Sequence, residues 1–442
     1  MKVKREVLIS GGGIAGLTLA LKLVKCDIPV TVIEQQDKPS KMYKGELLQP
    51  KSLSIFDLLG LLEQIKEDGM SFYKVNVKEL RKHEGHWRTI GTSSLNYQIL
   101  SSNYNYALMI PHERLKEMIF DELKTYETFE YISPGRFQGF DGTKAKVRIG
   151  NEVQQIDARF YVGAEGRQSP MRNAMNVSMH HTKYNHHFLT VTFPRPEHLQ
   201  EGEMITTKDR FLGMFPLKNN EVRTVYLIRP QEFKGRDKRE MLQEFYERYI
   251  DLMPELDGYV QQIRQWRDIQ RMIPFAYHVD RYVRRNCVLI GDAAHTVHPM
   301  AGEGMNLAIQ DADVLGELFC WMYENNKLDE HYLQWFEDVR KPRAEYVSKL
   351  SHQSALMYSF PSRVFQRVRL RGIKKTEEDK KLHLKQMLNI SGLGLWPNHL
   401  HDRFIQVGLL PARELEVSER PYIFSTDDDY PWLKLEGDEL DD

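Results

Sequence analysis

The sequence has little of what marks a membrane, secreted or nucleic-acid-binding protein. No apolar run approaches the roughly 18 residues of a membrane-spanning helix, so no such helix is expected. Lysines interrupt the apolar stretch after the basic N-terminus too early for a signal peptide. A net charge of -1 gives no reason to expect a nucleic-acid partner. We therefore expect a cytoplasmic protein that acts as a monomer or a homodimer.

Cysteine is scarce as well, and no metal site is expected. Cys26, Cys287 and Cys320 are scattered and odd in number, without a CxxC pair or zinc-ligand spacing. In a reducing compartment they are expected to be buried, unpaired thiols. His295 and His298 form an HxxH pair, but nearby glycines and a proline indicate a loop rather than a helix face. His295 is therefore expected to be a structural partner of that loop.

What the sequence does contain is a complete dinucleotide-binding pattern near its start. A β-prone run leads into a GxGxxG loop, helical apolar spacing follows, and a second β-prone run ends at Glu34. The glycines permit a tight turn, close approach to a pyrophosphate and close helix packing, and the helix N-terminus attracts phosphate. Glu34 is placed to bind an adenosine ribose and would repel the 2′-phosphate of NADP. The expected ADP-binding residues are Gly11, Gly13, Ile14, Ala15, Gly16 and Glu34.

A second strand–glycine–helix unit occurs at "GDAAHTVHPMAGEGMN", residues 291–306. A buried strand is expected over 287–290, a loop over 299–304, and a helix from Met305. Ligands bind at the carboxyl ends of strands in open α/β sheets, which is where Asp292 would lie. Two such units indicate a ligand longer than ADP.

These motifs resemble those of the flavin-dependent aromatic monooxygenases of the para-hydroxybenzoate hydroxylase type, which include the ubiquinone-biosynthesis hydroxylases. The resemblance covers about residues 5–350 and includes "GAEGRQSPMR" (163–172), which is similar to the family's D-G motif. It implies FAD as cofactor, NADH or NADPH as transient reductant, and O2. A flavin hydroperoxide would hydroxylate or epoxidise an aromatic or other electron-rich apolar small molecule. A flavin-dependent reductase or halogenase on the same fold is the alternative.

The resemblance also implies roles for individual residues. Asp292 would hold the ribityl hydroxyls of FAD, and Pro299 would line the pocket where oxygen reacts. His298, beside that proline, is a candidate to contact substrate. The backbone of the following loop would face the flavin pyrimidine edge, through Gly302, Gly304, Met305 and Asn306.

Four positions depart from the family pattern. Glu165 replaces the usual aspartate of the D-G motif, and Lys44 stands where arginine is common. His112 falls where the family has arginine or glutamine near the phosphates, and Arg114 could take that role instead. Glu303 replaces a glutamine and would place a negative charge near the flavin edge.

The remaining pattern predicts an α/β architecture. A Rossmann-like FAD-binding domain is expected over 1–70, 107–178 and 279–350. A mostly antiparallel sheet domain for substrate is expected over 71–106 and 179–278, and a helical region with an acidic tail over 351–442. The basic segment 361–375 is interpreted as a solvated helix face, with contact to a membrane or an acidic partner as the alternative. His186 and His187 are expected at the surface or a domain edge.

Overall fold

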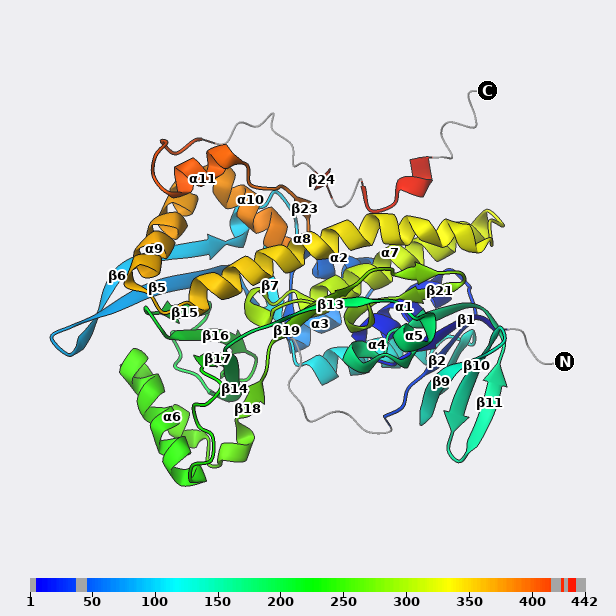
Figure 1. The fold of residues 1–442 in the computed structure, drawn as a ribbon, viewed down its shortest axis with the longest axis horizontal. Helices are drawn as coiled ribbons and strands as arrows, with labels where there is room; N and C mark the ends of the chain where they lie inside the picture. The colour runs from blue at the N-terminus through cyan, green and yellow to red at the C-terminus, as the bar shows by residue number, and fades with distance from the viewer. Residues whose placement is uncertain (1–4, 37–45, 415–422, 425–427, 435–442) are drawn as a thin grey trace.

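A six-stranded sheet carries both glycine loops in the computed structural model, which describes residues 5–36, 46–414, 423–424 and 428–434 (Figure 1). Its strand order is β20-β21-β12-β1-β2-β8. All neighbours are parallel except the β20–β21 pair at one edge. The strands are β1 (Arg5–Ser10), β2 (Val30–Ile33), β8 (Phe129–Ile132), β12 (Ala158–Gly163), β20 (Val283–Arg284) and β21 (Cys287–Leu289).

Helices α1 (Ile14–Lys25) and α7 (Gly304–Glu324), the two helices that follow the glycine loops, pack directly against each other. A Cβ added at Gly316 would lie 2.6 Å from Cγ of Lys22, so a side chain there would force the helices apart. The Lys22 ammonium in turn pairs with Asp313 at 2.5 Å. Helices α4 (His112–Leu123), α2 (Pro50–Leu58), α3 (Leu62–Asp68) and α5 (Pro170–Met175) complete this part, with the sheet β9 (Gly135–Asp141), β10 (Lys144–Ile149) and β11 (Glu152–Ile156).

The expectation of three unpaired thiols is wrong, because Cys26 and Cys320 form a disulfide. The disulfide joins the C-terminal end of α1 to α7, and its two cysteines are 294 residues apart in the sequence. Only the packing of the two helices brings these cysteines together. Cys287 is free and buried, and burial raises the pKa of its thiol to about 12.

A thiol count tests the disulfide directly. Unreduced protein, unfolded in denaturant, is expected to react with a thiol reagent only at Cys287, and reduced protein at all three cysteines. Reduction should also lower the free energy of unfolding by about 2–4 kcal/mol, since the crosslink restricts the unfolded chain. Three reactive thiols in the unreduced protein would contradict the pairing.

A seven-stranded sheet forms the second part, in the order β18-β14-β17-β16-β15-β5-β6. Its pairs are antiparallel except β15–β5, and helix α6 (Lys238–Leu252) covers one face (Figure 1). The strands are β5 (Lys74–His83), β6 (His86–Asn96), β14 (His187–Pro194), β15 (Gly202–Thr206), β16 (Phe211–Leu217), β17 (Glu221–Ile228) and β18 (Gln270–Met272).

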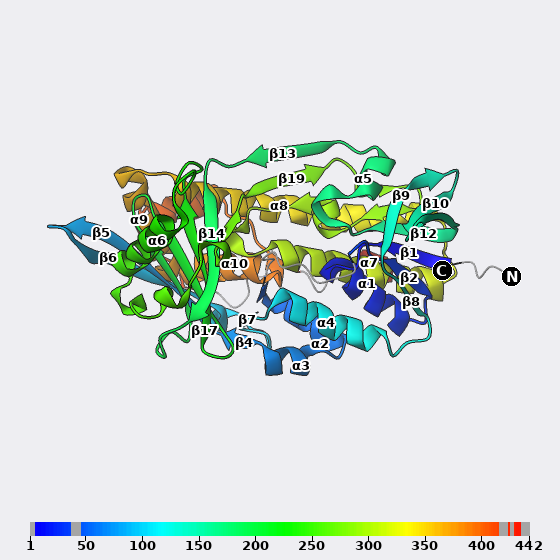
Figure 2. The same ribbon diagram turned by 90° about the horizontal axis from the view of Figure 1, so that it is seen from below.

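Two small sheets and a long helix connect the parts. In one sheet β19 (Phe275–Val279) lies between β13 (Met179–Lys183) and β22 (His295–Thr296); in the other β7 (Ala107–Met109) lies between β3 (Leu47–Leu48) and β4 (Met70–Phe72). Helix α8 (Gln334–Ser359) runs along both parts, as Figures 1 and 2 show. The chain ends in α9 (Arg363–Glu378), α10 (Lys380–Ser391), β23 (Gly394–Leu395), α11 (Leu400–Gln406) and β24 (Ile423–Phe424). None of the helices within the described ranges is long and apolar enough to cross a membrane.

The architecture is thus the expected α/β fold: a Rossmann-like parallel sheet, a mostly antiparallel second sheet and a helical C-terminal region. The predicted acidic end of the tail, 435–442, lies outside the described residues.

Candidate active site

Three loops that lie far apart in the sequence meet at the carboxyl ends of β1, β12 and β21. Gly11 has φ +113°, and a Cβ there would lie 2.3 Å from the carbonyl oxygen of Ala164. Gly291 has φ +57°, and its Cβ would lie 3.3 Å from that of Ala15. Both positions therefore favour glycine, because each has a positive φ and a close neighbour from another segment. The first glycine loop, the 163–172 segment and the 291–306 loop form one surface.

The N-termini of α1 and α7 are open on this surface. Gly13 precedes α1 and Gly304 begins α7, and a Cβ at either position would meet no atom within 4 Å. Neither helix has a side-chain cap, so the first N–H groups are available to a ligand. Two uncapped helix N-termini behind glycines suit a ligand with a diphosphate at one end and an anionic group at the other. FAD has this chemistry, and the residues fit it.

Glu34 is held in position at the end of β2. Its carboxylate oxygens accept hydrogen bonds from the backbone N–H groups of Gly12 and Gln36, each at 2.7 Å. The carboxylate thus lies beside the first glycine loop, where a ribose of a bound ADP group would reach it.

Glu165 organises the middle loop. Ser169 donates a hydrogen bond to its carboxylate at 2.6 Å, and the N–H of Met171 donates at 3.3 Å. Arg172, in the same segment, donates to the carbonyl oxygen of Ala293 at 3.0 Å and so joins this loop to the 291–306 loop. Burial raises the pKa of Glu165 to about 7, against the opposing hydrogen bond from Ser169.

This pKa gives a prediction with a definite sign. The folded protein holds the Glu165 proton more tightly than the unfolded chain does, so the group favours folding below its ordinary pKa of 4.5, and this contribution disappears as the pH rises to about 7. We expect apoprotein carrying Glu165→Gln to gain thermal stability relative to the wild type across that pH window. Melting curves at several pH values measure this, with the exposed Glu152→Gln as control. A constant difference across the window would contradict the prediction.

Asp292 lies at the carboxyl end of β21, as expected, with its side chain partly exposed on the loop surface. Arg167 approaches it at 3.5 Å, and the tyrosine hydroxyl of Tyr277 donates to its backbone carbonyl oxygen. The carboxylate therefore faces the junction of the second and third loops, in reach of a ligand that spans them.

A buried ion pair supports the 291–306 loop from behind. Asp311 on α7 is fully buried and accepts hydrogen bonds from the N–H of Gly291 at 2.9 Å, from His295 at 2.7 Å and from Arg340 at 2.9 Å. Although burial acts in the opposite direction, His295 and Arg340 keep the pKa of Asp311 below its usual value. The structural role expected for His295 is confirmed. Asp311 was missed, although an acid inside the apolar helical run was a signal.

Asn306 connects the same loop to the 47–52 segment. Its side-chain oxygen accepts from the N–H of Gln49 at 2.8 Å and from the Ser52 hydroxyl at 2.7 Å. Its amide donates to the carbonyl oxygens of Leu47 and Gly302, each at 2.9 Å. The side chain is thus fully used inside the protein, which leaves the backbone of this helix start to face a ligand.

Glu303 lies at the N-terminal end of α7. The residue is only 3% exposed, and its Oε1 has no hydrogen-bond partner in the part of the chain that the structure describes. Burial raises its pKa well above the usual range, although a hydrogen bond with Gln49 opposes the shift. Burial thus disfavours the negative charge that was expected beside this helix start.

His298 is completely buried and faces His186, which is 2% exposed, with 2.9 Å between the two Nε2 atoms. Of the two positions expected for His186, the surface or a domain edge, the surface is therefore wrong. His187 beside it is half-buried and hydrogen-bonded to Arg271. The N–H of Met300 donates to Nδ1 of His298 at 3.2 Å. His298 must then carry its proton on Nε2 and donate it to His186. Burial lowers the pKa of His298 to about 3 and of His186 to about 4, so both are neutral.

Three other expected phosphate-binding residues lie as follows. Lys44 lies outside the described residues. His112 is the first residue of α4 and is half-buried. Arg114 is exposed on the same helix, where it pairs with Asp68 at 2.6 Å and Glu117 at 3.4 Å. Its role in binding phosphate stays a prediction.

Comparison with known proteins identifies the class. The FAD binding domain family matches residues 4–351, so the chain belongs to that family. Among its relatives, 6-methylpretetramide 4-monooxygenase of Streptomyces rimosus is 26% identical over 387 residues, which cover 82% of this chain and 87% of that protein. Para-nitrophenol 4-monooxygenase of Pseudomonas sp. strain WBC-3 is 23% identical over 358 residues, covering 79% and 86%.

Solved structures share the fold. The crystal structure of a p-nitrophenol 4-monooxygenase from Pseudomonas putida superposes with a TM-score of 0.76 at 17% identity, covering 88% of this chain and 99% of that chain. The chain is therefore a member of the class A FAD-dependent aromatic monooxygenases, an oxidoreductase that uses FAD. These relatives favour oxygenation over the reductase or halogenase alternative.

Proposed function

We propose that the protein uses NADH or NADPH and O2 to hydroxylate or epoxidise an aromatic or other electron-rich apolar small molecule. The observation that carries this proposal is the meeting of three loops around two uncapped helix N-termini, with open space in front of Gly13 and Gly304. The relatives named as monooxygenases of 6-methylpretetramide and para-nitrophenol support an aromatic substrate.

The proposed cofactor contacts follow from this geometry. The N-terminus of α1 would bind the diphosphate, Glu34 the adenosine ribose, and Asp292 the ribityl chain. The N-terminus of α7 would face the pyrimidine edge, where each favourable dipole contact with negative charge contributes up to about 1 kcal/mol. Burial, which raises the pKa of Glu303, disfavours a second negative charge beside this helix start. When bound, FAD would accept hydride from the nicotinamide and activate O2.

We propose that the seven-stranded sheet, which contains β14, binds the substrate. We propose that residues 71–106 and 179–278 form the substrate domain and that 1–70, 107–178 and 279–350 form the FAD domain. The His186–His298 pair lies where the two proposed domains meet, beside Pro299. The directed hydrogen bond between these two neutral imidazoles would pass on the proton that a phenolic substrate must lose.

Substitution of His298 tests the proposed proton transfer. His298→Asn is expected to lower kcat/KM for oxygenation by about a hundredfold and to change its pH profile, with FAD binding retained. His187→Asn, which alters the neighbouring half-buried histidine, is the matched control. Loss of FAD affinity with the same pH profile would instead indicate a purely structural role.

The overall activity is tested on purified, FAD-loaded protein. NADH and NADPH oxidation is followed across a panel of phenols, quinolones and polyprenyl phenols, and product masses are measured. Gain of one oxygen atom, coupled to nicotinamide oxidation and dependent on O2, is expected for at least one substrate class. Gain of two hydrogens without O2 would favour a reductase, and a protein that binds no FAD would overturn the proposal.

A further inference from the structure

Helix α9 is packed with its polar side inward. Gln366, Arg369 and Thr376 are buried, whereas Val364 and Val368 are 67% and 55% exposed. The Arg369 guanidinium donates to the carboxylate of Glu79 on β5 at 2.7 and 3.0 Å, and Gln366 donates to the same carboxylate at 2.7 Å. A surface helix of a globular protein normally buries its apolar side instead. The ion pair therefore holds the apolar face of α9 toward the solvent.

The apolar face belongs to a larger patch. Among the described residues, ten of the sixteen exposed large hydrophobic side chains lie between positions 356 and 409, a concentration that scattered surface residues do not show. The Phe360 and Phe365 rings are 5.0 Å apart and join the end of α8 to α9. We call this the α8–α11 surface; its members are Leu356, Met357, Phe360, Val364, Phe365, Val368, Leu400, Phe404, Val407 and Leu409.

The α8–α11 surface is also cationic. Arg363, Arg367 and Arg371 follow one another at four-residue spacing on the outer side of α9, where all three are exposed. No described carboxylate pairs with them, and the sequence has no acidic residue from 361 to 376. The Arg371 guanidinium lies next to Gly408, between the exposed Val407 and Leu409, so charge and apolar surface interleave.

A cationic cavity opens beside the same helix. It has a volume of about 270 Å³ and lies where the N-terminal end of α9 meets the β5–β6 hairpin. Its walls include the carboxylate of Asp209 and the side chain of Arg363. They also include four further basic side chains, those of Arg81, Lys82, Lys208 and Arg210. Asp251 pairs with Lys82 and Arg210, and Asp209 pairs with Lys208, so the cavity adds only part of this positive charge to the neighbouring surface.

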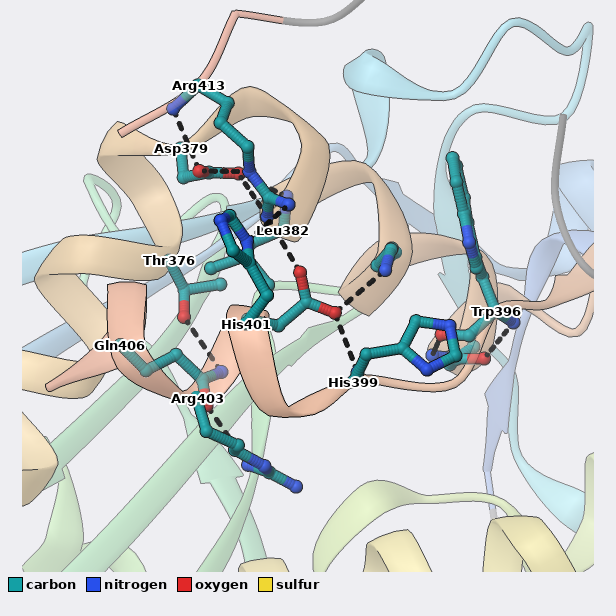
Figure 3. Close-up of polar contacts among 12 residues, drawn as sticks. Thr376, Asp379, Leu382, Trp396, His399, His401, Arg403, Gln406 and Arg413 are labelled. Carbon is teal, nitrogen blue, oxygen red and sulfur yellow. Dashed lines mark hydrogen bonds and ion pairs between the residues drawn. The ribbon is translucent and has the colours of Figure 1, made fainter. Parts of the chain in front are cut away.

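The helices that carry the surface are fixed to one another. Arg413 bonds Asp379 at the α9–α10 junction at 2.9 Å (Figure 3). It also bonds Asp402 on α11 at 2.8 Å, and buried Lys385 on α10 bonds Asp402 at 2.8 Å. Gln406 on α11 reaches Thr376 on α9 at 3.4 Å. The patch is therefore preformed and does not need to order when it binds.

We infer that the α8–α11 surface docks the protein onto an anionic phospholipid bilayer. Basic side chains interleaved with exposed apolar ones match the boundary between headgroups and acyl chains. A second copy of the chain fits poorly, because a two-fold contact would bring one arginine-rich patch against another. The surface lies at the end of the molecule opposite β10 and β11 (Figures 1 and 2). In the sequence, its residues follow residue 351, where the family match ends. This docking does not depend on the proposed reaction.

Vesicle flotation of the full-length protein tests the inference. The protein is expected to float with phosphatidylcholine–phosphatidylglycerol vesicles but not with phosphatidylcholine alone, and to be released by high salt. Arg367→Gln/Arg371→Gln should weaken binding by about tenfold or more, and Val364→Ser/Val368→Ser should also weaken it. Arg148→Gln/Val153→Ser, an exposed cross-strand pair on β10 and β11 at the far end, should bind like the wild type.

Other results would overturn the inference. Equal binding to neutral vesicles, or no binding, would exclude an anionic bilayer as the ligand. A dimer in light scattering that Val364→Ser/Val368→Ser dissociates would assign the surface to a second copy. Binding to polyglutamate that the valine substitutions leave unchanged would assign it to an acidic protein.

Discussion

Gly13→Ala is expected to weaken FAD binding by about a hundredfold while leaving the apoprotein folded. A methyl group at this position meets no atom within 4 Å, and the backbone φ of -80° is allowed for alanine, so the apoprotein accepts it without strain. The methyl group would, however, occupy the space through which the diphosphate approaches the N-terminus of α1. Loss of about two hydrogen bonds to charged phosphate oxygens corresponds to about 3 kcal/mol, or roughly a hundredfold increase in Kd.

Gly11→Ala provides the contrast. Its φ of +113° is rare for residues with a side chain, and the added Cβ would lie 2.3 Å from a backbone oxygen of Ala164 that cannot move independently of β12. We expect a loss of about 3 kcal/mol in the free energy of unfolding as well as loss of FAD. A Cβ at Gly372 in α9 would also meet no atom within 4 Å. Gly372→Ala should therefore keep FAD binding and raise the free energy of unfolding by up to about 1 kcal/mol.

FAD titration monitored by flavin fluorescence, together with melting curves of the apoproteins, separates the three glycine variants. Wild-type FAD affinity in Gly13→Ala would mean that the first glycine loop is not the diphosphate site. A stable apoprotein of Gly11→Ala would mean that the contact with Ala164 is looser than the structure shows.

The sequence predicted those parts of the fold and site that depend on neighbouring residues. The glycine loops, their flanking strands and helices, and Asp292 at a strand end follow from spacing along a few turns of chain. Because helix and strand periodicity is local, it also predicted the two-part architecture and the antiparallel second sheet.

Contacts between distant segments could not be predicted in this way. The pairs His186–His298 and Cys26–Cys320 exist because α1 packs on α7 and β14 ends beside the 291–306 loop. The raised pKa of Glu303 is a consequence of its burial, which no spacing within the GD motif reveals.

The largest loss of stability is expected from Asp311→Ala. This substitution leaves Arg340, whose side chain is 1% exposed, as a buried charge without its carboxylate, and it removes the acceptor of the His295 and Gly291 hydrogen bonds. Breaking a buried pair from one side costs about 3–5 kcal/mol. Denaturant unfolding of the apoprotein measures the loss, and the exposed Asp338→Ala on α8 should stay within about 0.5 kcal/mol of the wild type.

A double variant separates the two functions of Asp311. Asp311→Leu/Arg340→Met removes both charges and fills their volume, so much of the lost stability should return. FAD affinity should not return, because the N–H of Gly291 still lacks its acceptor and the loop that carries Asp292 is no longer fixed to α7. Recovery of both properties would mean that the ion pair serves stability alone. Recovery of stability without FAD binding would show that Asp311 positions the 291–306 loop for the cofactor.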